Sequence, residues 1–145
     1  MKYLCFDFGT RRIGIAASDP SGTLVRPVTT IDRKVTPKYI DEIKRILDEE
    51  NPQKIIFGLP LGPDAEETPM CKKVRTFVSK IYDSLNLETP YDFQDESFSS
   101  VRTQAIMLKS SSKKRRKEKP TIDKVAACVI LEDYLREQSG QISLF

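Results

Sequence analysis

Carboxylates at three separated places are the side chains in this sequence best suited to chemistry. Asp7 ends an apolar run that begins at Met1, and Asp95 and Glu96 follow a predicted strand, Pro90–Gln94. Asp123 lies in a helical pattern near the C-terminus. The chain has no histidine, which excludes Ser-His-Asp catalysis and histidine-ligated zinc. Carboxylate oxygens suit Mg²⁺ or Mn²⁺, and a pair of such ions promotes phosphodiester hydrolysis without histidine.

Each carboxylate also has a purely structural interpretation. Asp7 could cap the turn that follows it, and Asp123 could interact with the dipole of its own helix. Because neighbours on an extended chain point to opposite faces, only one of Asp95 and Glu96 can face a site. Asp123 shares a helix face with apolar residues, among them the small pair Ala126–Ala127, which allows that helix to approach a sheet closely. This pattern favours a site at the strand ends.

Hydrophobic periodicity and turn signals predict the elements that must position these carboxylates. Three short extended runs joined by tight turns indicate an antiparallel meander: Lys2–Phe8, Ile13–Ser18 and Thr23–Ile31. The rest of the chain alternates helix and strand. The predicted helices are Pro37–Glu50, Thr68–Leu85, Ser99–Lys109 and Ile122–Gln138, and the predicted strands are Lys54–Gly58 and Pro90–Gln94. The first helix is expected to have Thr36 as its N-cap and Pro37 as its first residue. The prediction is an α/β fold with a single mixed five-stranded sheet, an antiparallel meander followed by βαβαβ, flanked by helices.

Length and composition indicate one domain and a reducing environment. A chain of 145 residues with 39% hydrophobic content has enough material for one core, predicted over residues 1–139, followed by a flexible tail over 140–145. No apolar run approaches the ~20 residues of a membrane span, and no secretory signal is visible, so a cytoplasmic location is predicted. Cys5, Cys71 and Cys128 are widely spaced and odd in number, which predicts buried reduced thiols.

A run of positive charge precedes the last predicted helix. The net charge is only +3, yet Lys109–Lys119 holds seven lysines and arginines opposed only by Glu118. Such a run is either a solvated loop or a surface that binds a polyanion.

Four segments resemble the YqgF/RuvX family, in the same order and over nearly the whole chain: Cys5–Pro20, Phe57–Pro60, Asp95–Glu96 and Asp123–Ala127. The resemblance implies a ribonuclease H-like fold. It also implies an activity in Holliday junction resolution or in processing the 5′ end of the precursor of small-subunit ribosomal RNA.

The resemblance implies a set of site residues as well. By position, Asp7, Glu96 and Asp123 are the catalytic, metal-binding triad for two Mg²⁺ or Mn²⁺ ions, with Asp95 in reserve. Ser97 stands where the family usually has an arginine, and serine cannot clamp phosphate as a guanidinium does. The residues expected to contact nucleic acid are Thr10, Arg11, Arg12, Arg102, Lys113, Lys114, Arg115, Arg116, Lys117 and Lys119.

The predicted function is therefore that of a metal-dependent nuclease acting in 5′-end processing of pre-16S rRNA. The alternatives are a Holliday junction resolvase or other structure-specific DNA endonuclease, and a non-catalytic nucleic-acid-binding module. A further alternative is ATP handling, because Asp7–Thr10 also resembles the first phosphate loop of actin-like and sugar-kinase ATPases. Those proteins close two such lobes around the nucleotide, and 145 residues supply one.

The last five residues, 141–145, resemble the short motif with which bacterial replication and repair proteins bind the sliding clamp. Docking would use Gln141, Leu144 and Phe145, and the alternative is a frayed apolar tail. The expected partners are thus structured RNA or branched DNA, together with a sliding clamp if the tail docks. The chain is expected to act as a monomer or homodimer.

Overall fold

The structure is a computed structural model that describes residues 1–96 and 119–139, with the backbone alone over 119–124. Its elements in chain order are β1 (Tyr3–Phe8), β2 (Arg12–Ser18), β3 (Val25–Asp32), α1 (Tyr39–Glu50), β4 (Lys54–Leu59), α2 (Pro69–Leu85), β5 (Tyr91–Asp95) and α5 (Lys119–Gln138). The predicted helix Ser99–Lys109 and the predicted tail 140–145 lie outside the described residues. No helix within the described ranges is long and apolar enough to cross a membrane.

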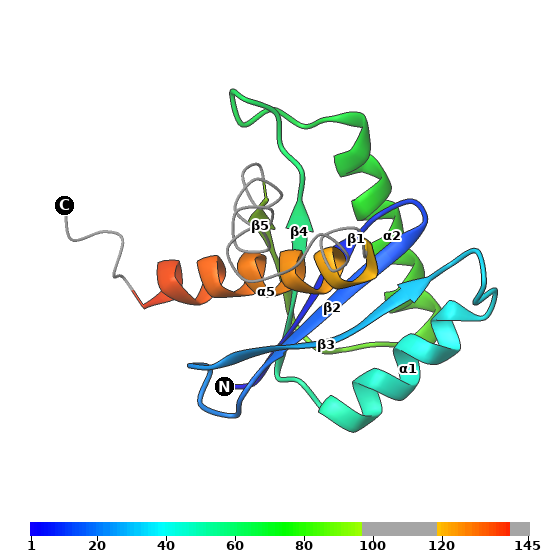
Figure 1. The fold of residues 1–145 in the computed structure, drawn as a ribbon, viewed down its shortest axis with the longest axis horizontal. Helices are drawn as coiled ribbons and strands as arrows, with labels where there is room; N and C mark the ends of the chain where they lie inside the picture. Colours follow the sequence, from blue (N-terminus) through cyan, green and yellow to red (C-terminus); the bar gives the residue numbers. More distant parts are fainter. Residues whose placement is uncertain (97–118, 140–145) are drawn as a thin grey trace.

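The strands form one five-stranded sheet in the order β3-β2-β1-β4-β5 (Figure 1). β1 pairs antiparallel with β2, and β2 antiparallel with β3, which is the predicted meander. β1 pairs parallel with β4, and β4 parallel with β5, as expected when helices connect the strands. The predicted mixed sheet is therefore confirmed, and its two parallel junctions bring the ends of β1, β4 and β5 to the same edge.

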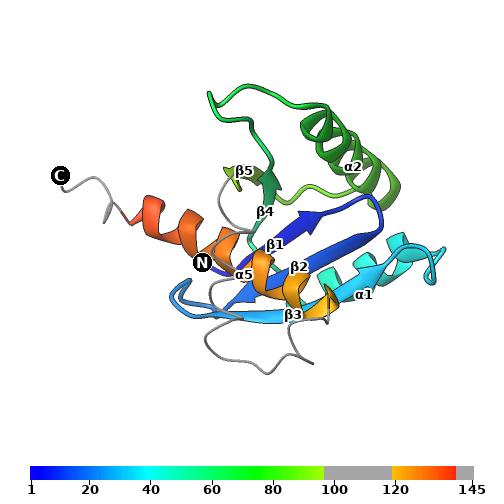
Figure 2. The ribbon, with the colours of Figure 1, turned by 45° about the horizontal axis from the view of Figure 1, so that its top comes forward.

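Alternation along β1 divides the core into two layers. Leu4, Phe6 and Phe8 pack with α1 and α2 on one face of the sheet. Cys5 lies on the other face with residues of α5, and Asp7, two residues further along the strand, projects from that same face. Figures 1 and 2 show α5 lying across the sheet opposite α1 and α2.

The helices follow the predicted apolar stripes, with one error at a helix start. The stripe predicted for α2 is Val74, Phe77, Val78, Ile81 and Leu85; the first four are buried and Leu85 is partly buried. Thr68 caps this helix by accepting a hydrogen bond from the N–H of Cys71 at 3.4 Å. The predicted start of α1 at Pro37 with Thr36 as N-cap is wrong: α1 begins at Tyr39, after Lys38, and no side chain caps it. The N–H of Thr36 donates to the carbonyl of Asp32 at 2.9 Å, so Thr36 belongs to the turn that ends β3.

All three cysteines are buried and none of them forms a disulfide bond, as predicted. Cys5 lies under α5, Cys71 lies in the core between α2 and the sheet, and Cys128 packs beside Ala16 of β2. Their burial in separate clusters explains why they contribute to packing and not to a disulfide framework.

Candidate functional site

Asp7 and Glu96 meet on the face of the sheet that α5 covers. Asp7 is the last but one residue of β1, and Glu96 directly follows the last residue of β5. The two carboxyl groups share a side-chain hydrogen bond. The N–H of Glu96 donates to the carbonyl of Leu59 at 3.2 Å, which continues the pairing of β4 with β5 by one residue. This additional pairing directs the Glu96 side chain to the same face as Asp7.

The structure distinguishes Glu96 from its neighbour Asp95. In the parallel register Asp95 lies opposite Leu59, whose side chain packs in the core under α1 and α2. The side chain of Asp95 is exposed, whereas Glu96 is partly buried and hydrogen-bonded to Asp7. Glu96 is therefore the member of the pair that lies with Asp7, while metal binding by Glu96, with Asp95 in reserve, stays a prediction.

Gly58 of β4 makes the space that the Glu96 carboxylate occupies. A Cβ atom built on Gly58 would lie 2.9 Å from Oε2 of Glu96 and 2.9 Å from Cδ1 of Ile130 in α5. Real Cβ contacts are almost never so short, so any side chain here must displace the carboxylate, the helix, or both. A glycine within a strand often marks such a close approach.

Burial and mutual repulsion control the protonation of this pair. Burial, followed by the negative charge and hydrogen bond of Asp7, raises the pKa of Glu96 from 4.5 to about 9. Burial also raises the pKa of the Cys5 thiol, and the nearby charges of Asp7 and Glu96 raise it further. Two carboxylates this close share a proton when no cation compensates them. A divalent cation with a preference for oxygen ligands is the partner that would replace this proton.

Asp123 lies in α5, the helix that covers these carboxylates. The helix begins at Lys119, three residues before the predicted start at Ile122, so Asp123 is outside its first turn and the helix-dipole interpretation loses support. Asp123 precedes Ile130 by seven residues, which places both on one helix face about 10 Å apart along the axis. The side chain of Asp123 is not described, and the described side chains alone contain no group of three potential metal ligands. Its role as the third ligand stays a prediction.

The turn that follows Asp7 is held by its own backbone and by neighbouring charges. The N–H of Gly9 donates to the carbonyl of Arg12 at 2.8 Å, and Arg33 donates to the carbonyl of Thr10 at 3.0 Å. Arg11 forms an ion pair with Asp32 at 3.2 Å. The predicted contacts of Thr10, Arg11 and Arg12 with nucleic acid thus come from an ordered turn beside Asp7.

Several predicted binding residues are not part of the described structure. Arg102, the basic residues 113–118, and the tail residues Gln141, Leu144 and Phe145 lie outside the described ranges, and only the backbone of Lys119 is described. Contact of the basic run with nucleic acid and docking of the tail on a clamp therefore stay predictions.

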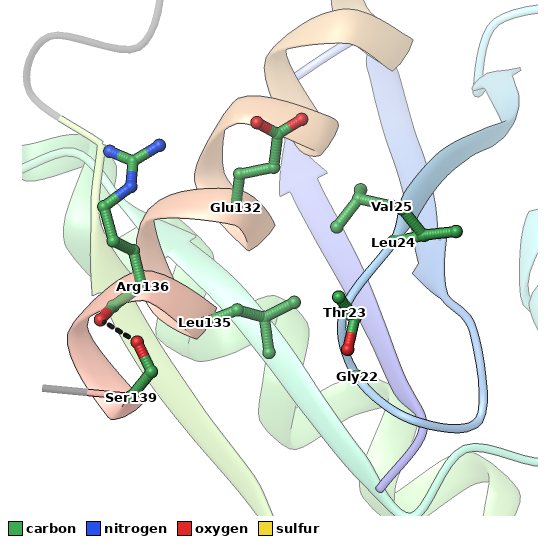
Figure 3. A pocket seen from close by; sticks show the side chains of 8 residues that line it. All are labelled: Gly22, Thr23, Leu24, Val25, Glu132, Leu135, Arg136 and Ser139. Carbon is green, nitrogen blue, oxygen red and sulfur yellow. Dashed lines mark hydrogen bonds between the residues drawn. The ribbon is translucent and has the colours of Figure 1, made fainter. Parts of the chain in front are cut away.

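A hollow at the other end of the sheet is separate from this site. It has a volume of ≈ 550 Å³ and is lined by residues of the β2–β3 turn and of the end of α5: Gly22, Thr23, Leu24, Val25, Glu132, Leu135, Arg136 and Ser139 (Figure 3). The antiparallel register pairs Leu4 with Ala17 near this turn, and Asp7 with Gly14 at the opposite end. The hollow and the carboxylates therefore lie at opposite edges of the sheet.

Two features that place α5 over the site were not predicted from the sequence: Gly58 leaves room for the helix, and Tyr134 anchors it. The role of Gly58 was not assigned, although a glycine inside an apolar strand is a signal of close approach. The hydroxyl of Tyr134 donates to Oδ2 of Asp92 at 3.0 Å, which anchors the second half of α5 to β5. No local pattern predicts this contact, because its partners lie far apart in the sequence.

Comparison with known proteins gives a consistent set of relatives. Residues 1–137 match the RuvX family, whose description is Holliday junction resolvase. A candidate pre-16S rRNA nuclease of Chromobacterium violaceum is 36% identical over 137 residues, covering 94% of this chain and 98% of the relative. A protein of Clostridium botulinum with the same description is 38% identical over 135 residues, covering 93% and 96%.

Two solved structures have a similar fold. The Fowlpox virus resolvase, in complex with Holliday junction DNA, superposes with a TM-score of 0.58 at 15% identity, covering 95% of this chain and 99% of that one. RuvC of T. thermophilus, in complex with a Holliday junction substrate, superposes with a TM-score of 0.55 at 11% identity, covering 97% of both chains. At these identities the likeness concerns the fold, which is the ribonuclease H-like arrangement expected from the sequence.

Proposed function

Because this chain belongs to the RuvX family of Holliday junction resolvases, and is thereby a nuclease, we propose that it cleaves structured RNA in a metal-dependent reaction. The proposed reaction is 5′-end processing of pre-16S rRNA. One observation carries the metal-dependent part: the carboxyl groups of Asp7 and Glu96, distant in sequence, share a hydrogen bond at the edge where the parallel strands end.

The proposed site consists of Asp7 and Glu96, with Asp123 contributed by α5. Bound there, one or two Mg²⁺ or Mn²⁺ ions would supply an activated water and stabilise the leaving oxygen. The chain's own contribution is to hold the carboxylates in place: Asp7 through the pairing of β1, and Glu96 through its backbone bond to Leu59 and the space at Gly58. Without metal, the raised pKa of Glu96 means that this carboxyl group keeps its proton at neutral pH. Binding of a metal ion would release that proton, because metal ligands must be ionised.

The names of the relatives favour RNA as substrate. The relatives from Chromobacterium violaceum and Clostridium botulinum are described as candidate pre-16S rRNA nucleases. The second candidate function, Holliday junction resolution, is favoured by the family description and by the fold shared with two junction-bound resolvases. A resolvase would need two copies of the chain to make two symmetric cuts. The proposal includes the cytoplasmic location expected from the sequence.

A cleavage panel tests the proposal. The purified chain is incubated with Mg²⁺, Mn²⁺ or EDTA and three substrates: a pre-16S rRNA fragment with its 5′ extension, a single strand of the same sequence, and a four-way DNA junction. Shortening of the 5′ extension only with divalent metal is the expected result. Cleavage of the junction alone would support Holliday junction resolution, the second candidate function. Absence of cleavage on all three substrates would contradict both and favour a non-catalytic nucleic-acid-binding module.

Replacing Gly58 by alanine should disturb this site through Glu96. The added methyl group would lie 2.9 Å from Oε2 of Glu96 and 2.9 Å from Cδ1 of Ile130, so the carboxylate, α5, or both must move. A displacement of about 1 Å at a reacting centre commonly reduces the rate by about 100-fold. We expect kcat/KM of Gly58→Ala to fall by that order while the protein stays folded in a thermal-unfolding assay.

The matched control is Gly62→Ala, in the loop after β4. There the three atoms nearest to the new methyl group belong to the exposed side chain of Glu66, which can swing away with the loss of its hydrogen bond from the N–H of Asp64. Gly62→Ala should keep normal activity, and an equal loss in both variants would contradict the assigned role of Gly58.

A further inference from the structure

Positive side chains without an ion-pair partner gather in one part of this structure. Most described lysines and arginines form ion pairs, for example Lys44 with Asp48 and Arg75 with Glu67. Those for which no ion pair is found within the described ranges lie in the β3–α1 connection and on α2: Arg33, Lys34, Lys38, Lys72, Lys73 and Lys80. Since most described lysines and arginines elsewhere have an acidic neighbour, this cluster is the one whose positive charge is available to an external partner.

A groove lies between these two segments. Its volume is ≈ 570 Å³, and it is lined by Phe8, Thr10, Arg33, Tyr39, Pro69, Lys72, Lys73, Thr76, Phe77 and Lys80. A smaller hollow of ≈ 460 Å³ continues from it along the β3–α1 connection and adds Arg11, Lys34 and Pro37. Among the residues that the structure describes, no acidic side chain lines either one. This combination of positive walls and no acidic lining fits a ligand with repeated negative charges.

Arg33 forms part of the groove wall and keeps donor capacity. Its guanidinium lies 5.2 Å from the centre of the Phe8 ring and 4.8 Å from that of Tyr39, which holds it in place. One of its terminal nitrogens donates to the carbonyl of Thr10, and its buried Nε finds no acceptor among the described residues. Arg33 also lines both hollows, so the other N–H groups of its guanidinium can donate to a phosphate oxygen there.

The groove is continuous with the turn that follows the carboxylates. Phe8 lines the groove and directly follows Asp7, but points to the opposite face of β1. Thr10 of the β1–β2 turn lines both the groove and the smaller hollow. Figures 1 and 2 show this turn beside α2. A nucleic-acid strand that runs from the carboxylates across this turn would therefore enter the groove.

We propose that this groove, the α2 groove, binds a single-stranded flank of the nucleic-acid substrate through its phosphates. The inference rests on the proposed nuclease function. Its size suits one nucleotide at a time and not a duplex, while its floor of Phe8, Tyr39 and Phe77 is apolar enough to contact a sugar or base. Binding through phosphates is independent of sequence and sensitive to salt.

The test compares two variants with equal loss of charge. Lys73→Gln/Lys80→Gln removes two unpaired lysines of the α2 groove, and Lys44→Gln/Arg45→Gln removes two exposed, ion-paired charges of α1. Binding is measured in EDTA, without cleavage, on a duplex with and without a single-stranded tail. We expect the groove variant to bind the tailed substrate about 10-fold more weakly. The slope of the logarithm of the binding constant against the logarithm of salt concentration should fall in magnitude by about 2. The control should bind normally.

Three results would overturn the α2 groove proposal: an equal loss in both variants, an equal loss with and without the tail, or competition by inorganic phosphate or a mononucleotide as strong as by a tailed strand. Cleavage is scored separately, where the groove variant should raise KM and leave kcat unchanged. If no substrate is cleaved by any form, the proposed function fails, while tail-dependent binding still supports the groove.

Discussion

Asp7→Asn is expected to reduce the rate of cleavage by about 1000-fold and to leave the affinity for nucleic acid unchanged or higher. Asparagine has nearly the same size but loses the negative charge that a cation needs, and losing one well-placed electrostatic group commonly costs 10²–10³ in rate. Binding does not fall, because the change removes a negative charge that repels phosphates. The rate is measured in single-turnover cleavage, and affinity is measured in EDTA.

Asp64→Asn provides the control for this experiment. Asp64 is exposed in the loop between β4 and α2 and loses the same charge. Normal cleavage is expected from it. If Asp7→Asn retained more than about a tenth of the wild-type rate, Asp7 would be a structural turn residue and the carboxylate site would be wrongly assigned.

Glu96→Gln abolishes metal-dependent cleavage and changes how stability depends on pH. The pKa of Glu96 is raised in the folded protein from 4.5 to about 9, first by burial and then by Asp7. Between these two values the folded state holds a proton that the unfolded state releases, so metal-free stability falls as pH rises from 4.5 through about 9. Glutamine cannot ionise, so this part of the decline disappears in the variant.

Thermal unfolding in EDTA at several pH values, repeated with Mg²⁺, measures this effect. The wild-type midpoint should fall more steeply with pH than that of Glu96→Gln, by about 2–4 °C for each kcal/mol of difference. Mg²⁺ should restore the wild-type midpoint at high pH and have little effect on the variant. Asp64→Asn is again the control, since Asp64 is exposed in the loop between β4 and α2 and its replacement should leave both curves unchanged. Superimposable pH curves for wild type and Glu96→Gln would remove Glu96 from the site.

The sequence was sufficient for the elements and for the type of chemistry. Strands β1 and β2 are short β-rich runs bounded by turn signals and helix α2 follows a 3.6-residue stripe, and both are local properties that a single segment carries by itself. The absence of histidine limited hydrolysis to carboxylates, and Asp7 stood out because it ended an apolar strand. Local reasoning failed at the start of α1, where Thr36 is used by the turn after β3 and not as a helix cap.

Only the tertiary structure decided which residues meet. The selection of Glu96 over Asp95 depends on one additional backbone bond to Leu59, and the space for its carboxylate depends on Gly58 lying under Ile130. The positive groove exists because residues of the β3–α1 connection and of α2, distant in sequence, line the same space. Periodicity records which face of an element is apolar, whereas sheet register and the approach of helices depend on the packing of the whole core. The sequence alone therefore identified the chemistry of the site, and the folded chain determined its geometry.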